Sequence, residues 1–276
     1  MAFAGGAAGG RQYHSTTRST SETTMPGVEG RRVLLTGGNR GIGTAAAKLF
    51  RERGAKVCIV ARTEATLESS GFAYVAADLS TRGGCSAAIK GAIDQLGGPI
   101  DILVCNHGIG SAHEKPIHLT DIDDWKTSMD TNVIGPFYLT REVMPSMVEK
   151  RYGRIVYTAS TAATEAEPGA CGYNTSKAGL CGLMRSVAQD GGEYNVTSNA
   201  VLPGWVKTEM ADRSAKAEAE AKGTTQEEIW KQRAALYPAQ RVLTPEEVAH
   251  TILFLASEES SGVSGESIRV SGSCPW

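Results

Sequence analysis

Short apolar runs alternate with longer segments of helical periodicity from Gly30 to the end of the chain. The apolar runs are rich in β-branched residues and too short for helices, so they predict buried strands. The expected strands are Arg32–Thr36, Lys56–Ala61, Phe72–Ala77, Ile100–Cys105, Arg154–Ala159, Val196–Leu202 and Ser267–Val270. The expected helices are Ile42–Arg53, Gly83–Leu96, Phe137–Lys150, Gly172–Gly191 and Pro245–Ser257.

This alternation predicts a single domain of the α/β class. Strands joined through helices run parallel, and right-handed crossovers place helices on both faces of the sheet. We therefore expect a doubly wound Rossmann-type sheet of about seven strands, with ligands bound outside the carboxyl ends of the strands. The long segment between Leu202 and Pro245 is rich in Ala, Glu and Lys. It predicts a lid of short amphipathic helices at about residues 205–240.

Charge and composition narrow the classes of partner. The chain of 276 residues has 28 Lys and Arg against 30 Asp and Glu, which gives a net charge of −2. This balance gives no reason to expect nucleic acid or an acidic membrane as a partner, and no apolar run is long enough to span a membrane. The six scattered cysteines favour a reducing compartment, and the histidines lack the spacing of a metal site.

Residues 1–28 differ from the rest of the chain. They are rich in Ala and Gly and then in Ser and Thr, with Glu22 as the single acid. We expect this extension to be disordered and the folded domain to span residues 29–276. The extension fits an organelle transit peptide and a non-specific extension equally well. The expected location is the cytoplasm, or a mitochondrion or plastid if the extension is a targeting signal.

A glycine-rich segment follows the first expected strand. The sequence TGGNRGIG places Gly37, Gly41 and Gly43 between that strand and an alanine-rich helix. Glycine lets a pyrophosphate approach the free N–H groups and the positive end of the helix dipole. The position of this segment between a strand and a helix therefore predicts a dinucleotide site.

Charged residues after the second expected strand indicate which dinucleotide binds. An NAD site places a carboxylate there to hold the ribose 2′-hydroxyl. This chain has Ala61 followed by Arg62, and Arg40 extends from the glycine-rich segment towards the same region. Two guanidinium groups without a carboxylate suit a 2′-phosphate, so the sequence predicts NADP(H). Asp78, after the third strand, is placed to hydrogen-bond the adenine amino group.

Three residues near the fifth expected strand predict carbonyl chemistry. Ser160 ends the strand, and Tyr173 and Lys177 share one face at the start of the next helix. Hydride transfer to a carbonyl needs a proton donor at the carbonyl oxygen. We expect Tyr173 to be this acid and base, and Ser160 to orient the carbonyl by a hydrogen bond. The ammonium of Lys177 is expected to lower the pKa of Tyr173 towards neutrality.

These segments resemble, in order, the motifs of the short-chain dehydrogenase/reductase family over residues 30–272. The motifs are TGGNRGIG, Asp78-Leu79, CNHG, Asn132, Ser160, Tyr173 with Lys177, and PGWVKT. The resemblance implies that Asn132 supports a water that relays protons through Lys177. It further implies a homodimer or homotetramer formed through the two long helices. The cofactor contacts that it implies are Gly37, Asn39, Arg40, Gly41, Ile42, Gly43, Arg62, Asp78, Leu79, Asn106, Gly108, Tyr173, Lys177, Pro203, Gly204, Val206 and Thr208.

The chain departs from the family pattern at three places. His107 stands where the family usually has alanine, which adds bulk near the expected cofactor site. The segment after the second strand is short, which trims the helix beneath the adenine. Trp276 ends the chain in place of the usual Asp-Gly-Gly, where it would cover a neighbouring subunit or its own pocket.

The predicted function is hydride transfer between NADP(H) and a ketone or secondary alcohol, with a 3-oxoacyl carbonyl as one candidate. Two alternatives stay open: a non-catalytic NADP(H)-binding protein, and an NAD-dependent hydroxy-acid or alcohol dehydrogenase of the same family. The lid resembles that of 3-hydroxybutyrate dehydrogenases. The positions that hold a carboxylate in those enzymes are Ala112, Ala162, Ala170 and Ser214 here.

Overall fold

The computed structural model describes residues 27–110 and 115–274. Its centre is a seven-stranded sheet in which all paired strands are parallel, in the order β3-β2-β1-β4-β5-β6-β7. The order reverses between β1 and β4, so the crevice expected in such folds lies at their carboxyl ends. The strands are β1 (Arg32–Thr36), β2 (Lys56–Ala61), β3 (Ala73–Ala76), β4 (Ile102–Cys105), β5 (Gly153–Thr158), β6 (Val196–Pro203) and β7 (Ser267–Val270).

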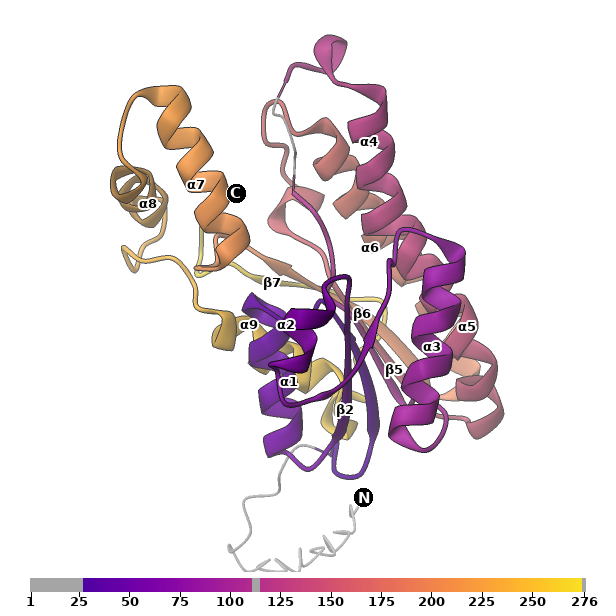
Figure 1. Ribbon diagram of the computed structural model, residues 1–276. Coiled ribbons are helices and arrows are strands. Elements are labelled where there is room, and N and C mark those ends of the chain that lie inside the picture. The colour runs from indigo at the N-terminus through magenta and orange to yellow at the C-terminus, as the bar shows by residue number, and fades with distance from the viewer. Residues whose placement is uncertain (1–26, 111–114, 275–276) are drawn as a thin grey trace, which may run out of the picture.

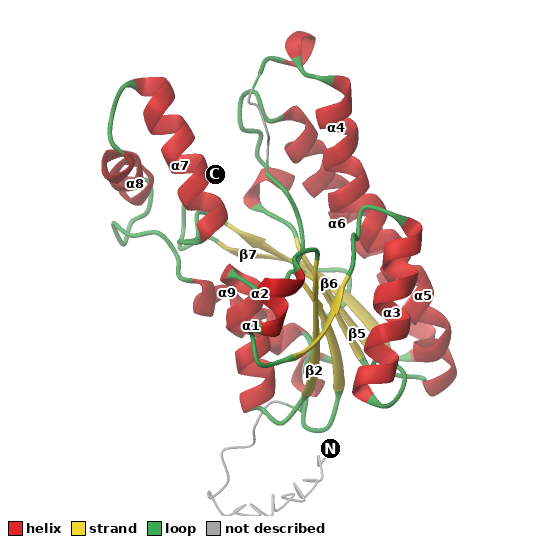
Figure 2. Cartoon of the chain, viewed as in Figure 1, coloured by secondary structure: helices red, strands yellow, loops and turns green. Residues whose placement is uncertain are grey.

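Helices cover both faces of this sheet (Figures 1 and 2). The alternation of side chains along β1 separates two apolar cores, because Val33 and Leu35 point to one face and Leu34 to the other. The first face is covered by α1 (Gly41–Glu52) and α9 (Pro245–Leu255). The second face is covered by α3 (Arg82–Leu96), α5 (Gly135–Lys150) and α6 (Cys171–Gly191).

The predicted fold class is confirmed by this architecture. All seven expected strands and all five expected helices form, and their ends differ from the predicted ones by at most two residues. One domain boundary was wrong: Val28, assigned to the disordered extension, is fully buried and belongs to the folded part. Residues 1–26, on which the rest of that expectation falls, lie outside the described residues, as does Trp276.

Two short helices were not predicted. One is α2 (Glu64–Glu68), whose five residues agree with the expected trimming after the second strand. The other is α4 (Ile122–Met129), in a part of the chain for which the sequence analysis gave no element. Asp121 signals its start, because its carboxylate accepts hydrogen bonds from the amides of Asp123 and Asp124.

The expected lid forms as two helices, α7 (Glu209–Lys222) and α8 (Gln226–Ala235). It rises from the same end of the sheet as α4 and the start of α6, on the opposite side (Figure 1). Ala215, Ala219 and Ile229 form a small core of its own between the helices. The two ends of the segment meet in a parallel bridge between Val206 and Leu243. The lid is therefore a closed unit attached at one narrow base.

Membrane-spanning helices, disulfides and metal sites were each looked for among the described residues. No helix among the described residues is long and apolar enough to cross a membrane. The six cysteines are all free, and all but Cys171 are buried. Within residues 27–110 and 115–274, no three His, Cys, Asp or Glu side chains gather as a metal site would require.

Asp101, just before β4, should contribute measurably to stability. Its side chain accepts hydrogen bonds from Arg32 and Lys150 at 2.8–3.2 Å and is 6% exposed. Burial alone would raise the pKa of Asp101, but these bonds outweigh burial and hold the pKa at about 2. We predict that Asp101→Asn lowers the free energy of unfolding at pH 7 by about 2 kcal/mol, measured in urea.

The loss should depend on pH in a defined direction. The folded-state pKa is depressed, so the stabilisation is complete above the unfolded pKa of about 4 and is lost as the pH falls towards 2. Asp94→Asn, at an exposed position on α3, serves as the control. A loss that is equal at both positions, or that persists unchanged at pH 2.5, would contradict the assignment.

Candidate active site

The glycine-rich turn between β1 and α1 leaves no room for side chains. Gly37 and Gly41 have positive φ angles of 66° and 53°. A Cβ atom on Gly43 would lie 2.1 Å from the carbonyl oxygen of Gly37, and one on Gly41 would lie 3.2 Å from Thr208. Glycine at these positions therefore allows β1, α1 and the base of the lid to meet at one point.

The first amides of α1 are available to a ligand. Its N-cap residue is Arg40, whose side chain makes no capping hydrogen bond, and the first turn holds no acid. Five other helices, by contrast, have a side-chain cap at their start, from Thr81, Asp121, Thr208, Thr225 and Thr244. Free N–H groups and a positive helix end are what a pyrophosphate requires, so this cradle fits a dinucleotide.

The loop after β4 is held against this turn by Thr36. Its hydroxyl accepts hydrogen bonds from the amides of Asn106 and His107 at 3.0 and 3.2 Å and lies 2.7 Å from His107 Nδ1. The Asn106 side chain donates to the carbonyls of Thr36 and Gly37, both at 3.3 Å. The two loops expected to contact the cofactor are therefore one hydrogen-bonded unit.

The bulk of His107 is accommodated inside the protein. Burial, together with the charge of Lys177, lowers the pKa of His107 to about 4, so the ring is neutral at pH 7. A Cβ atom on Gly135 would lie 3.2 Å from His107 Nε2, so the glycine at the start of α5 makes room for the ring. The larger side chain at position 107 is thus accommodated because position 135 is a glycine.

The residues expected around the adenosine lie near the ends of β2 and β3. Arg62 is exposed directly after β2, and Asn39 donates a hydrogen bond to Thr66 at 2.9 Å. Hydrogen bonds from the backbone and hydroxyl of Ser80, with a smaller contribution from Arg62, lower the pKa of Asp78. Leu79 is buried in the core beside it. The last residue of β2 is thus Ala61 in place of a carboxylate, and the cation Arg62 follows it.

Tyr173 and Ser160 are brought together by β5 and α6. Ser160 caps a short 3₁₀ turn directly after β5, and its hydroxyl accepts a hydrogen bond from the Ala162 amide at 3.2 Å. Tyr173 lies in the first turn of α6, near enough to the Ser160 hydroxyl for that group to lower the pKa of Tyr173. A phenol and a hydroxyl that lie close together can both donate hydrogen bonds to the same carbonyl oxygen of a substrate.

Lys177 is buried below this pair. Its Nζ lies 5.6 Å from the centre of the Tyr173 ring and donates a hydrogen bond of 2.9 Å to the carbonyl of Thr158. Burial lowers the pKa of Lys177 to about 8. A Cβ atom on Gly108 would lie 3.3 Å from Nζ, so the glycine after β4 admits the amine.

The expected effect of Lys177 on Tyr173 was wrong for the chain without cofactor. Burial raises the pKa of Tyr173, the bond with Ser160 lowers it, and the charge of Glu167 raises it again, with a net upward shift. Tyr173 is therefore a protonated phenol at neutral pH, which is the form that donates a proton.

Asn132 connects this site to the loop after β4. It lies in a π-helical turn (Asp130–Ile134) between α4 and α5 and is fully buried. Its amide pairs with the backbone of Ile109 through bonds of 2.9 and 3.0 Å and donates to Ser176 at 3.0 Å. Ser176 in turn donates to the carbonyl of Tyr173 at 2.8 Å. Turns of this type often mark functional sites.

The segment that leaves β6 carries the residues expected to frame the nicotinamide. Pro203 ends the strand, and a Cβ atom on Gly204 would lie 2.5 Å from the hydroxyl of Tyr237. That hydroxyl accepts a hydrogen bond from the Trp205 amide at 2.5 Å. Val206 is buried and Thr208 caps α7. The turn is thus fixed by a tyrosine from the far end of the lid.

Comparison with known proteins identifies the class of this site. A family model described as enoyl-(acyl carrier protein) reductase matches residues 37–272. The 3-oxoacyl-[acyl-carrier-protein] reductase FabG of Rickettsia prowazekii is 33% identical over 257 residues, which cover 90% of this chain and 98% of that protein. The chain belongs to the short-chain dehydrogenase/reductase family. The recognition from the motifs is thereby confirmed.

Solved structures agree with this family assignment. Levodione reductase superposes with a TM-score of 0.84 at 26% identity, covering 88% of this chain and 97% of that one. A 3-ketoacyl-(acyl-carrier-protein) reductase from Brucella melitensis, complexed with NADH, has a TM-score of 0.80 at 27% identity, with 90% and 100% covered. The chain is therefore an oxidoreductase of a family that binds a nicotinamide cofactor.

Three contributing residues were missed by the sequence analysis. Thr36 and Ser176 are polar residues within apolar or helical segments, and their hydroxyls join loops that carry the expected site residues. Tyr237 lies almost 30 residues beyond the motif that it holds. Thr36 directly precedes Gly37 and could have been suspected, whereas Tyr237 has no local signal because the lid folds back to bring it there.

The close approach of Gly43 to Gly37 gives a direct test of the cofactor cradle. Gly43→Ala must displace the backbone, so we predict that affinity for NADH and NADPH falls by at least about tenfold, measured by fluorescence titration. Gly83→Ala, on α3 with open space around the new methyl group, is the matched control. Unchanged binding of both nucleotides by a folded Gly43→Ala variant would exclude this turn as the cofactor site.

Proposed function

We propose that the chain reduces the ketone carbonyl of a 3-oxoacyl-type substrate with NADPH. The observation that carries the proposal is the proximity of Tyr173, Ser160 and the buried Lys177 at the carboxyl end of β5. The substrate class is supported by the relatives from Rickettsia and Brucella, which are a 3-oxoacyl- and a 3-ketoacyl-(acyl carrier protein) reductase. The bound cofactor supplies the hydride, and the groups of the chain supply the proton and the alignment.

Each of these groups has a distinct part in the reaction. Tyr173, protonated at neutral pH, gives its proton to the oxygen on which negative charge develops. Ser160 donates a hydrogen bond to the same oxygen and holds the carbonyl in place. Lys177 stabilises the resulting tyrosinate, because its ammonium lies on the same helix face. Asn132 supports the route by which Lys177 recovers a proton, as the family resemblance implies.

Two observations support a ketone over a small hydroxy acid. Ala162 and Ala170 are buried and apolar where 3-hydroxybutyrate dehydrogenases hold a carboxylate. The hydroxyl of Ser214 already accepts a hydrogen bond from Arg233 at 3.1 Å. Ala112, the fourth of these positions, lies outside the described residues. Ala162 and Ala170 thus offer no polar group for a substrate carboxylate, and Ser214 has only its O–H left to donate.

We also propose that the chain forms a homodimer or homotetramer through α5 and α6. Phe137 at the start of α5 is 42% exposed, which is unusual for a large apolar side chain on a helix that otherwise covers the core. The long faces of these helices would bury it against a second copy.

Substitution of Tyr173 tests the catalytic assignment. We predict that Tyr173→Phe lowers kcat by about 100-fold or more for acetoacetyl-CoA and for simple ketones, because the proton donor is removed. The dissociation constant of NADPH should stay within about twofold, since the hydroxyl is lost without loss of the ring. Tyr194→Phe, at the opposite end of α6, is the control. If the Tyr173→Phe variant oxidises NADPH with these ketones as fast as the unmodified chain, the catalytic assignment is wrong.

The cofactor preference has its own test. Arg62 follows β2 where an NAD site would carry a carboxylate, so Arg62→Ala should raise the NADPH dissociation constant about tenfold or more. Binding of NADH, which lacks the 2′-phosphate, should change less than about twofold. If the unmodified protein prefers NADH, as the cofactor of the Brucella complex would allow, the NADP(H) assignment is wrong.

A further inference from the structure

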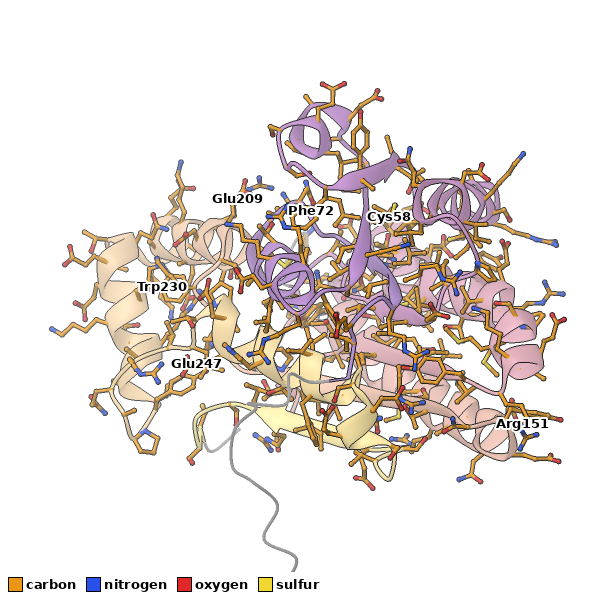
Figure 3. The ribbon with its side chains drawn as sticks, turned by 90° about the horizontal axis from the view of Figure 1, so that it is seen from below. Cys58, Phe72, Arg151, Glu209, Trp230 and Glu247 are labelled. Carbon is orange, nitrogen blue, oxygen red and sulfur yellow. The ribbon has the colours of Figure 1, made fainter. Side chains whose placement is uncertain are left out.

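The lid is tied to the cofactor turn by one ion pair. Among the described residues, Arg40 lies 3.6 Å from the carboxylate of Glu209, the first residue of α7. Thr208, next to Glu209, packs against Gly41. Figure 3 labels Glu209 at the side of the lid that faces the N-terminal part of the fold. The guanidinium assigned above to the 2′-phosphate is therefore already occupied by a carboxylate of the same chain.

The Arg40–Glu209 ion pair is weak enough for Arg40 to exchange the carboxylate for another anion. The two side chains are 44% and 54% exposed, and 3.6 Å is longer than a charge-assisted hydrogen bond. Exposed pairs of this kind are weak and are screened by salt. A phosphate with two negative charges and three acceptor oxygens matches the guanidinium fork better than one distant carboxylate oxygen does. Glu209 itself keeps a second partner, Arg213, one turn along α7.

Side-chain contacts join the two helices of the lid to each other and to the turn before Glu209. Arg233 on α8 is buried, bonds to Glu218 on α7 at 2.8 Å, and stacks 3.6 Å from the Trp205 ring. Asp212 binds Trp230 of α8 at 3.0 Å. These contacts make α7, α8 and the turn before them one body. If Glu209, the first residue of α7, changes its partner, the effect is therefore transmitted to the whole lid.

We propose that Glu209 competes with the cofactor 2′-phosphate for Arg40 and thereby sets the preference between NADPH and NADH. NADPH binding exchanges the Arg40–Glu209 pair for an Arg40–phosphate pair, and NADH binding leaves the ion pair intact. Glu209 then reduces NADPH affinity without affecting NADH, and the lid is detached from the glycine turn by the phosphorylated cofactor alone. The inference rests on the NADP(H) assignment of the proposed function.

A double-mutant cycle on binding tests this competition. Dissociation constants of NADPH and NADH are measured by fluorescence for the unmodified chain, Glu209→Gln, Arg40→Gln and the double variant. We expect Glu209→Gln to tighten NADPH about two- to fivefold and to leave NADH within about 1.5-fold. The tightening should vanish when Arg40 is also replaced. Glu220→Gln, an exposed acid on the same helix, controls for general charge effects.

A second variant should act in the opposite direction. Arg213→Gln removes the other partner of Glu209, so the carboxylate engages Arg40 more fully and NADPH binding weakens. The inference is overturned if Glu209→Gln changes both nucleotides equally, or if its effect survives in the Arg40→Gln background. If Arg40→Gln weakens NADPH but Glu209→Gln does nothing, this inference fails and the cofactor assignment stands. If NADPH binding is insensitive to Arg40 and no tighter than NADH, both fail.

Discussion

The burial of one amine, Lys177, governs the arrangement of the site. The side chain is 5% exposed, and burial lowers its pKa to about 8, so the fold disfavours the charged form that the chemistry needs. The surroundings compensate through a carbonyl, that of Thr158, and through a glycine, Gly108, that leaves room. Holding a titratable amine close to neutrality is what allows it to take up and release protons within one reaction cycle.

The same constraint explains the hydrogen-bond chain around Asn132. A buried lysine at the start of a helix requires that the helix, the strand beside it and the next loop keep their spacing. Asn132 bridges Ile109 of the loop and Ser176 of α6, and Ser176 continues to the backbone of Tyr173. This buried polar network is satisfied at each link, which rigidifies the site. The π-helical turn is the backbone conformation that delivers the asparagine to it.

The fold could be predicted from sequence because its signals are local. Strands such as Arg32–Thr36 are short, apolar and bounded by turns. The glycines that follow this first strand indicate a tight turn into a helix that binds a dinucleotide. The positions of Ser160, Tyr173 and Lys177 follow from one strand and one helix. The direction of the pKa shift of Tyr173 could not be predicted, because it depends on how far the folded chain buries this side chain. Tyr237 was missed because the lid returns it from a distant part of the chain to the motif after β6.

Adjacent strands of this sheet come from distant parts of the sequence. Val33 in β1 pairs with Ile102 in β4, and Arg154 bonds with Glu258, 104 residues later. Contacts between residues so far apart in the sequence form slowly, because the chain loses the entropy of closing a long loop before the contacts stabilise the fold. Since Gly41 meets Thr208, a growing chain on the ribosome has no complete nucleotide cradle until most of it has been synthesised. A nucleotide therefore stabilises the finished fold and cannot guide its early assembly.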